Sequence, residues 1–365
     1  MTSRPRRSQK VASGPLHDGR RRSDLMLMTM QPRRLFTLSL LVAAGLTGLI
    51  LALDPLLDSV PHPPDRGPWW YFWRLAEPTF LSRASAWIGY GLHQISLWIV
   101  LILLARKPAV PGRVSPLNVA ALLVNLFFVL LHILQTHLFY DGLAQDVPVW
   151  TSQWSVIIML IIVIYQATPL RGFILGKRLP WNQRGLRLSH RFHGFYISWA
   201  LVYTFWFHPT EGDFGLLIGF FYMFLLLIQL SFARTEIHLS LAWIVLLELL
   251  VGIHGPAIAI QKMIAGGEGA AAGFGPGTWI MFLSGFLFMF AFTGQYGLRW
   301  SRPLRALVIV AYLALVVGLF AWWDLGRLYM VTFIPVALYG GALVYGGIFE
   351  LLARIRRRPS KATPS

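Results

Sequence analysis

Apolar runs of about 18 to 22 residues, nearly free of charged side chains, recur ten times along this chain. At a rise of about 1.5 Å per residue, a helix of that length crosses about 30 Å of hydrocarbon. Hydrophobic residues make up 56% of the 365 residues and charged residues only 13%, which excludes an ordinary soluble protein. The sequence therefore predicts an all-α, polytopic integral membrane helical bundle with about ten transmembrane helices.

The predicted transmembrane helical domain covers residues 35–353. Two basic segments, 1–34 and 354–365, flank it, and the first is predicted to be disordered because it is polar and poor in apolar residues. The ten predicted spans, each end uncertain by a few residues, are 35–54, 86–105, 117–138, 150–168, 190–208, 214–233, 237–256, 277–297, 304–323 and 328–352.

The distribution of positive charge predicts the orientation in the membrane. With the N-terminus in the cytoplasm, the outer loops hold only five of the 32 Lys and Arg residues, namely Arg66, Arg74, Arg83, Lys262 and Arg327. Such a bias is the positive-inside rule, so we expect a cell-membrane protein with both termini in the cytoplasm. The net charge of +17 then reflects topology and attraction to membrane lipids, not binding of nucleic acid.

Histidine is the residue type with the greatest potential for chemistry in this chain. There is no cysteine, which excludes disulfides, iron–sulfur clusters and thiolate metal sites. Ionisable side chains at membrane depth are costly and usually functional. Eight of the ten histidines are predicted at that depth, and these are His93, His132, His137, His190, His193, His208, His238 and His254.

Two of the predicted spans carry a histidine toward each end. His193 and His208 are 15 residues apart in the fifth span, and His238 and His254 are 16 apart in the seventh, which correspond to about 22 to 24 Å along a helix. Because these spans run in the same direction, they offer one histidine pair near each face. Two stacked b-type haems need this arrangement of axial ligands. On one ideal helix, however, a 16-residue separation turns the two side chains about 160° apart.

Residues 187–256 resemble the ferric reductase-like transmembrane b-type cytochromes. The resemblance rests on "LRLSHRFHGFYISWALVYTFWFH" and on "HLSLAWIVLLELLVGIH" two spans later. It implies a membrane electron carrier with two haems b, in which His193 and His238 form the inner ligand pair and His208 and His254 the outer pair. His190 is an alternative inner ligand, since 18 residues place it and His208 on one helix face. The expected electron source is a donor protein or quinol.

A second constellation predicts a site on the outer face. The third span ends in "LHILQTHLFYDGLAQDVP", which carries His132, His137 and Asp141 toward the outside. Together with His208, these imidazoles and carboxylates suit a divalent metal or general acid–base catalysis on a lipid-linked substrate. We therefore consider His132, His137 and His208 as metal ligands and Asp141 as a catalytic residue.

Glu248 supports a third hypothesis, because it is predicted near the bilayer centre. An uncompensated charge there costs at least about 2.5 kcal/mol, so this carboxyl is expected to be protonated or paired within the bundle. A proton relay, a transport-site acid and a hydrogen-bonded structural residue all fit that position. The sequence thus leaves three hypotheses open, which are a haem protein, an outer-face membrane enzyme and a proton-coupled transporter.

Overall fold

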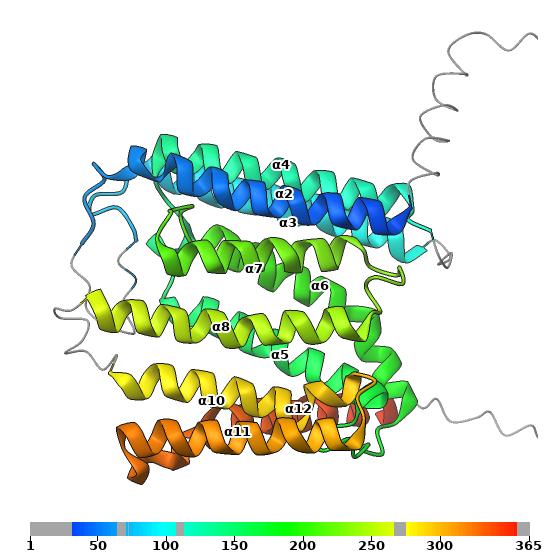
Figure 1. Ribbon diagram of the computed structural model, residues 1–365. Helices are drawn as coiled ribbons and strands as arrows, with labels where there is room; N and C mark the ends of the chain where they lie inside the picture. Colours follow the sequence, from blue (N-terminus) through cyan, green and yellow to red (C-terminus); the bar gives the residue numbers. More distant parts are fainter. Residues whose placement is uncertain (1–30, 64–70, 72, 107–112, 266–274, 356–365) are drawn as a thin grey trace, which may run out of the picture.

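The computed structural model describes residues 31–63, 71, 73–106, 113–265 and 275–355. The predicted basic tails lie almost wholly outside these ranges. Ten long α-helices fill most of the described chain (Figure 1). They are α2 (Pro32–Leu53), α3 (Phe80–Arg106), α4 (Pro116–Phe139), α5 (Val149–Arg171), α6 (Gln183–Phe207), α7 (Phe214–Ser231), α8 (Leu241–Ala265), α10 (Pro276–Phe292), α11 (Arg302–Trp323) and α12 (Phe333–Ile355).

Nine of these ten helices are long and apolar enough to cross a membrane. The remaining one, α6, has 25 residues but is less apolar, because His190, Arg191 and His193 fall in its first half. It nevertheless packs against α3, α5, α7 and α12. The prediction of an all-α, multi-pass helical bundle is therefore confirmed, with α6 as a polar helix among apolar ones.

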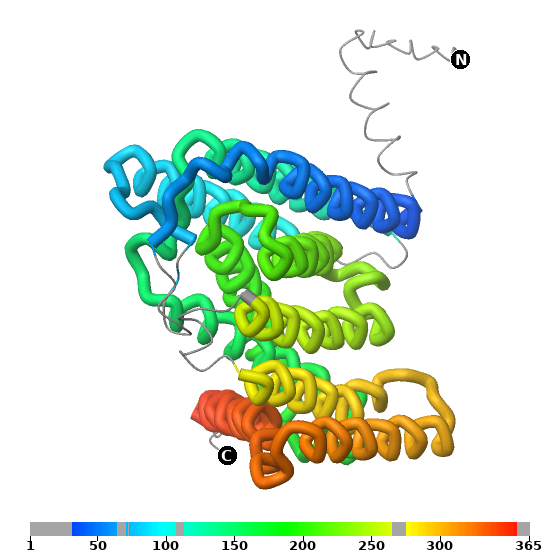
Figure 2. The backbone as a smooth tube through the Cα atoms, turned by 60° about the vertical axis from the view of Figure 1, so that its left-hand side comes forward, coloured from blue at the N-terminus to red at the C-terminus, as the bar shows by residue number. Residues whose placement is uncertain are grey.

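The helices lie side by side and alternate in direction (Figures 1 and 2). One edge of the bundle is formed by α2, α3 and α4, and the other by α10, α11 and α12, with α5 to α8 between them. The helix ends at Pro32 and Ile355 lie at the same end of the bundle, on the right of Figure 1. An even number of helices that alternate in direction produces this arrangement, whereas the side of the membrane on which both ends lie stays a prediction.

The centre of the bundle is aromatic. Phe205, Trp206 and Phe207 near the end of α6 are completely buried, and Phe220 of α7 packs edge-on against Phe205. Among the candidate spans α7 is the most buried and α11 the least. The best-packed part of the molecule is therefore where α6 and α7 meet, and large apolar side chains on the peripheral helices are left to face lipid.

Several helix boundaries differ from those predicted, and α8 matters most for function. The predicted span was 237–256, but the helix begins at Leu241 and continues to Ala265. Glu248 is thus only seven residues, or about 10 Å, from the start of a 25-residue helix, and not near its middle as predicted. His238 lies before the helix, in the turn that joins α7 to α8.

Candidate functional site

The predicted inner pair, His193 and His238, and the predicted outer pair, His208 and His254, consist of half-buried histidines. His193 is the eleventh of the 25 residues of α6, and His254 is the fourteenth of the 25 residues of α8, so both lie near the middle of their helices. His208 directly follows α6, and His238 lies just before α8. Both helices pack on α7, which connects them in the chain. The pairing itself stays a prediction.

The inner pair is oriented by backbone carbonyls. Nδ1 of His193 donates to the His190 carbonyl at 2.7 Å, and Nδ1 of His238 donates to the Gln229 carbonyl at 2.9 Å. A carbonyl can only accept, so in each neutral ring the proton is on Nδ1 and the lone pair is on Nε2. Neither Nε2 has a hydrogen-bond partner within the described chain. Both rings are thus fixed with the lone pair of Nε2 unused within the described chain.

The Nδ1 atoms of the outer pair differ from those of the inner pair in their hydrogen-bond partners. Nδ1 of His208 and the Tyr71 hydroxyl are hydrogen-bonded at 2.6 Å. Burial raises the pKa of Tyr71, and Glu211 and Asp213 act in the same direction, so its phenol stays protonated. Nδ1 of His254 is buried without a partner in the part of the chain that the structure describes. As in the inner pair, neither Nε2 forms a hydrogen bond there.

A glycine gives His254 its place against α7. A Cβ built on Gly219 would lie 2.8 Å from Cε1 of His254, closer than real Cβ atoms approach other groups. The imidazole therefore packs directly on the α7 backbone, where any larger residue would displace it.

The helix boundaries remove the angular difficulty noted in the sequence. His238 precedes α8, and His208 follows α6 with an extended backbone at φ −101° and ψ 136°. Neither residue is constrained by 100° steps from its partner on the same helix. The calculated turn of about 160° between His238 and His254 consequently does not apply.

Three other membrane-depth histidines have both ring nitrogens in hydrogen bonds. His93 bonds to Asn125 at 2.9 Å and accepts from Trp206 at 3.2 Å, and His132 bonds to Gln135 and to the His208 carbonyl. His137 faces the carbonyls of Ile133 and Leu53. His190 is exposed, and its Nδ1 donates to Leu186. An unbonded Nε2 on a half-buried ring therefore distinguishes His193, His208, His238 and His254 from these four histidines.

The predicted metal ligands are not gathered into one cluster. His132 meets His208 only through the backbone carbonyl of the latter, at 2.8 Å, and both nitrogens of His137 face carbonyls. Among the described residues no group of three or more His, Asp or Glu side chains is placed to hold a metal ion. The structure thus offers paired imidazoles in place of a three-ligand site.

Glu211, Tyr140 and His62 form a hydrogen-bonded cluster. His62 was not among the histidines predicted at membrane depth. Glu211 accepts hydrogen bonds from the Tyr140 hydroxyl and from Nε2 of His62, the latter at 3.0 Å. Tyr140 ends α4 with φ 43°, a left-handed conformation that is uncommon for a residue other than glycine. Because His62 and Glu211 are 149 residues apart, no local sequence signal predicted this contact.

Asp141, predicted to be catalytic, is a fully buried loop carboxyl next to this cluster in sequence. Its Oδ1 accepts from the Gly142 amide at 2.8 Å, and its Oδ2 has no partner within the described chain. Burial raises the pKa of Asp141 to about 6. Below about pH 6 the folded protein therefore favours the protonated form of this carboxyl.

We expect Asp141→Asn to remove a pH dependence of stability. The folded-state pKa of about 6 exceeds the ordinary value of 3.8 for an aspartate, so native stability falls as pH rises from about 4 to about 6 and stays reduced above that range. Unfolding temperature, measured from pH 4 to pH 8, should show this fall in the parent protein and lose it in the variant. An equal slope in both proteins would contradict the assignment.

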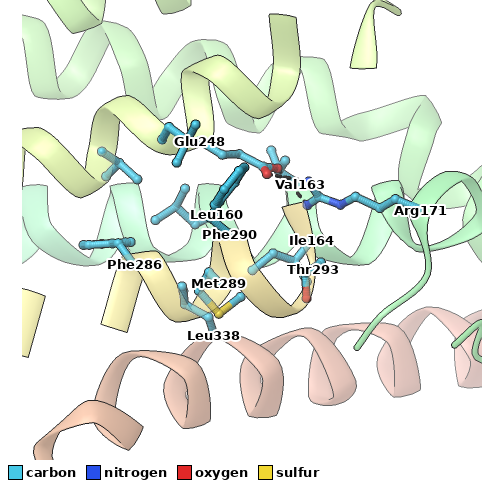
Figure 3. Close-up of a pocket in the computed structure, with 12 residues that line it drawn as sticks. Leu160, Val163, Ile164, Arg171, Glu248, Phe286, Met289, Phe290, Thr293 and Leu338 are labelled. Atoms are coloured by element: carbon cyan, nitrogen blue, oxygen red, sulfur yellow. Dashed lines mark hydrogen bonds and ion pairs between the residues drawn. The ribbon is translucent and has the colours of Figure 1, made fainter. Parts of the chain in front are cut away.

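Glu248 is paired within the bundle, with a partner that the sequence did not reveal. Arg171, the last residue of α5, forms a two-pronged salt bridge with both Glu248 oxygens, and Nη2 lies 2.7 Å from Oε1 (Figure 3). The Arg171 side chain is 2% exposed and that of Glu248 is 23% exposed. A cavity of about 30 Å³, space for about two water molecules, lies beside the pair. The pair therefore joins α5 to α8 beside a small cavity.

No known protein family, characterised protein or solved structure matches this chain. Its function is consequently inferred from the geometry of its own residues.

Proposed function

We propose that the protein is a b-type haem protein that carries electrons across or within the membrane. His193 and His238 would hold one haem, and His208 and His254 the other. The observation that supports this most strongly is the state of these four half-buried imidazoles, in which no Nε2 forms a hydrogen bond within the described chain. Bound haem supplies one-electron chemistry at its iron.

The surroundings of His193 and His238 fit axial ligands. Ligating histidines commonly donate their other ring nitrogen to a carbonyl or another acceptor, which fixes the ring and increases its basicity. His193 and His238 do so through main-chain carbonyls. In the outer pair, Nδ1 of His208 is hydrogen-bonded to the Tyr71 hydroxyl, and Nδ1 of His254 has no partner within the described chain.

The chain itself would insulate the two sites and keep them apart. The 15 residues between His193 and His208 correspond to about 22 Å along α6. The rings of Phe205, Phe220 and Phe224 pack against one another where α6 meets α7. These close-packed side chains leave no room for water at that point of the interior.

Titration of the purified protein with haemin tests the proposal. We expect saturable uptake near two equivalents per chain, with absorption spectra of low-spin, six-coordinate haem. His137→Ala serves as a control, because both nitrogens of His137 face carbonyls and the substitution should leave uptake unchanged. Unsaturable uptake, or the loss of uptake in the control, would argue against specific ligation.

The cluster of Glu211, Tyr140 and His62 favours a second candidate, an outer-face membrane enzyme. A buried carboxylate that receives a phenol and an imidazole has the composition of a general acid–base site. Asp141 would contribute to the same face. If so, Glu211→Gln should abolish turnover of a lipid-linked substrate while haem content stays unchanged. If haem content falls instead, the cluster serves the histidine pairs.

The transporter hypothesis has less support from the site. Glu248 meets Arg171 through two hydrogen bonds, and the adjoining cavity of about 30 Å³ admits little more than water. A salt bridge that ties two helices together is the simpler role for this carboxylate.

A further inference from the structure

An apolar groove lies between α2, α4 and α7. It holds about 170 Å³. Leu38 and Leu123 at its rim are 52% and 60% exposed, so it opens toward the surrounding lipid. An apolar cavity of about 150 Å³ admits benzene, and the groove therefore has space for one six-membered ring.

The floor of the groove is polar, formed by Asn125 of α4 and Ser231 of α7. Asn125 is 5% exposed and Ser231 is fully buried. The Ser231 hydroxyl donates to the Leu227 carbonyl at 2.8 Å, so it must accept from Nδ2 of Asn125, 2.9 Å away. The amide of Asn125 is thereby oriented with its nitrogen toward α7.

His93 fixes the other half of the same amide. Trp206 donates to Nδ1 of His93 at 3.2 Å, which leaves Nε2 as the donor to Oδ1 of Asn125 at 2.9 Å. One N–H of Asn125 is used by Ser231, and the second has no acceptor within the described chain. The floor of the groove thus has a rigidly held, buried amide with one N–H unused within the described chain, and a ligand with an acceptor would satisfy that N–H.

The groove shares α7 with the inner histidine pair. Gln229, between Ile228 and Ser231 on that helix, receives the Nδ1 proton of His238 at its carbonyl and donates its side-chain amide to the His238 carbonyl at 3.0 Å. Ile228 and Ser231 line the groove. The groove and His238 therefore contact the same stretch of α7.

We propose that this groove binds the ring of a lipid-soluble quinone. A quinone carbonyl would accept the spare N–H of Asn125, the ring would fill the apolar space, and the tail would leave between Leu38 and Leu123 into the bilayer. A lipid acyl chain has no acceptor to place at Asn125 and is not flat. The choice of a redox-active ring rests on the proposed function, whereas the groove and its donor do not.

Binding of decylubiquinone to the purified protein in nanodiscs tests this proposal, and decylbenzene serves as a ligand of similar shape without carbonyls. We expect saturable binding of decylubiquinone and at least tenfold weaker binding of decylbenzene. Val42→Trp, which fills the groove from α2, should abolish quinone binding. Leu41→Trp is the matched control, because Leu41 is 66% exposed and lies outside the groove.

Asn125→Leu tests the donor separately and should weaken decylubiquinone binding by about fivefold or more, the equivalent of one neutral hydrogen bond. If that variant unfolds, Val42→Trp still decides the question, since it leaves the polar floor intact. Equal affinity for decylbenzene, or unchanged binding in Val42→Trp, would overturn the proposal. Quinone binding by a protein that takes up no haem would support the groove and refute the proposed function, so the two failures are distinguishable.

Discussion

His193→Ala and His238→Ala are each expected to reduce the haem content from two groups per chain to one. Each substitution removes one of the two imidazoles that would hold the inner group, while His208 and His254 remain at the other end of the bundle. Even indirect support of a metal ligand is usually worth 10- to 100-fold in affinity, so loss of the ligand itself should be larger. Pyridine haemochrome absorbance per mole of protein measures the effect.

His190→Ala is the control for this experiment. His190 lies three residues from His193, its ring centroid is 5.6 Å from that of His193, and it is exposed. With His238 as the inner partner of His193, the control should retain both groups. Loss of one haem in His190→Ala but not in His193→Ala would indicate that His190, and not His193, is the inner ligand. Retention of both groups in all variants would exclude these ligand pairs.

Arg171→Ala is expected to destabilise the protein by about 3 kcal/mol. The substitution leaves the Glu248 carboxylate within the bundle without its two-pronged partner, and breaking a buried ion pair typically costs about 3 to 5 kcal/mol. The expected loss is at the lower end of this energy range because the Glu248 side chain is 23% exposed. Glu248→Gln should be destabilising for the converse reason. Unfolding in mixed micelles of increasing denaturing detergent measures both effects.

An exposed ion pair in the same protein gives a matched control. Arg327 and Asp324 are 3.2 Å apart with side chains 56% and 46% exposed, so Arg327→Ala should change stability by less than about 1 kcal/mol. Replacing both Arg171 and Glu248 by leucine should recover much of the loss, because no charge then remains unpaired. A stable Glu248→Gln variant would contradict the structural role and revive the transporter hypothesis.

Most of the fold was predictable because the membrane requires it. Each apolar run of sufficient length became a helix, since backbone groups in lipid must be satisfied within the segment. The boundaries were harder, because hydropathy does not mark where a helix begins inside an apolar run. For α8 the prediction started four residues early and ended nine residues early, which misplaced both His238 and Glu248.

The candidate site was only partly predictable. Spacing and direction along the chain were enough to propose which histidines pair, because both depend on regular helices. The partner of Glu248 was not predictable, because Arg171 is 77 residues away in the sequence and lies beyond the predicted span 150–168. Tyr71 and Gln229, which orient His208 and His238, were also missed. They come from a connecting loop and from another helix, and only tertiary packing brings them to the rings.

A reduced-minus-oxidised absorption spectrum of the protein, purified from haem-replete cells, tests the proposed function most directly. Two sites with paired histidine ligands predict a sharp α band and a Soret shift on reduction by dithionite, at an intensity that corresponds to two haems b per chain. A colourless, folded preparation would contradict the assignment of all four histidines as ligands.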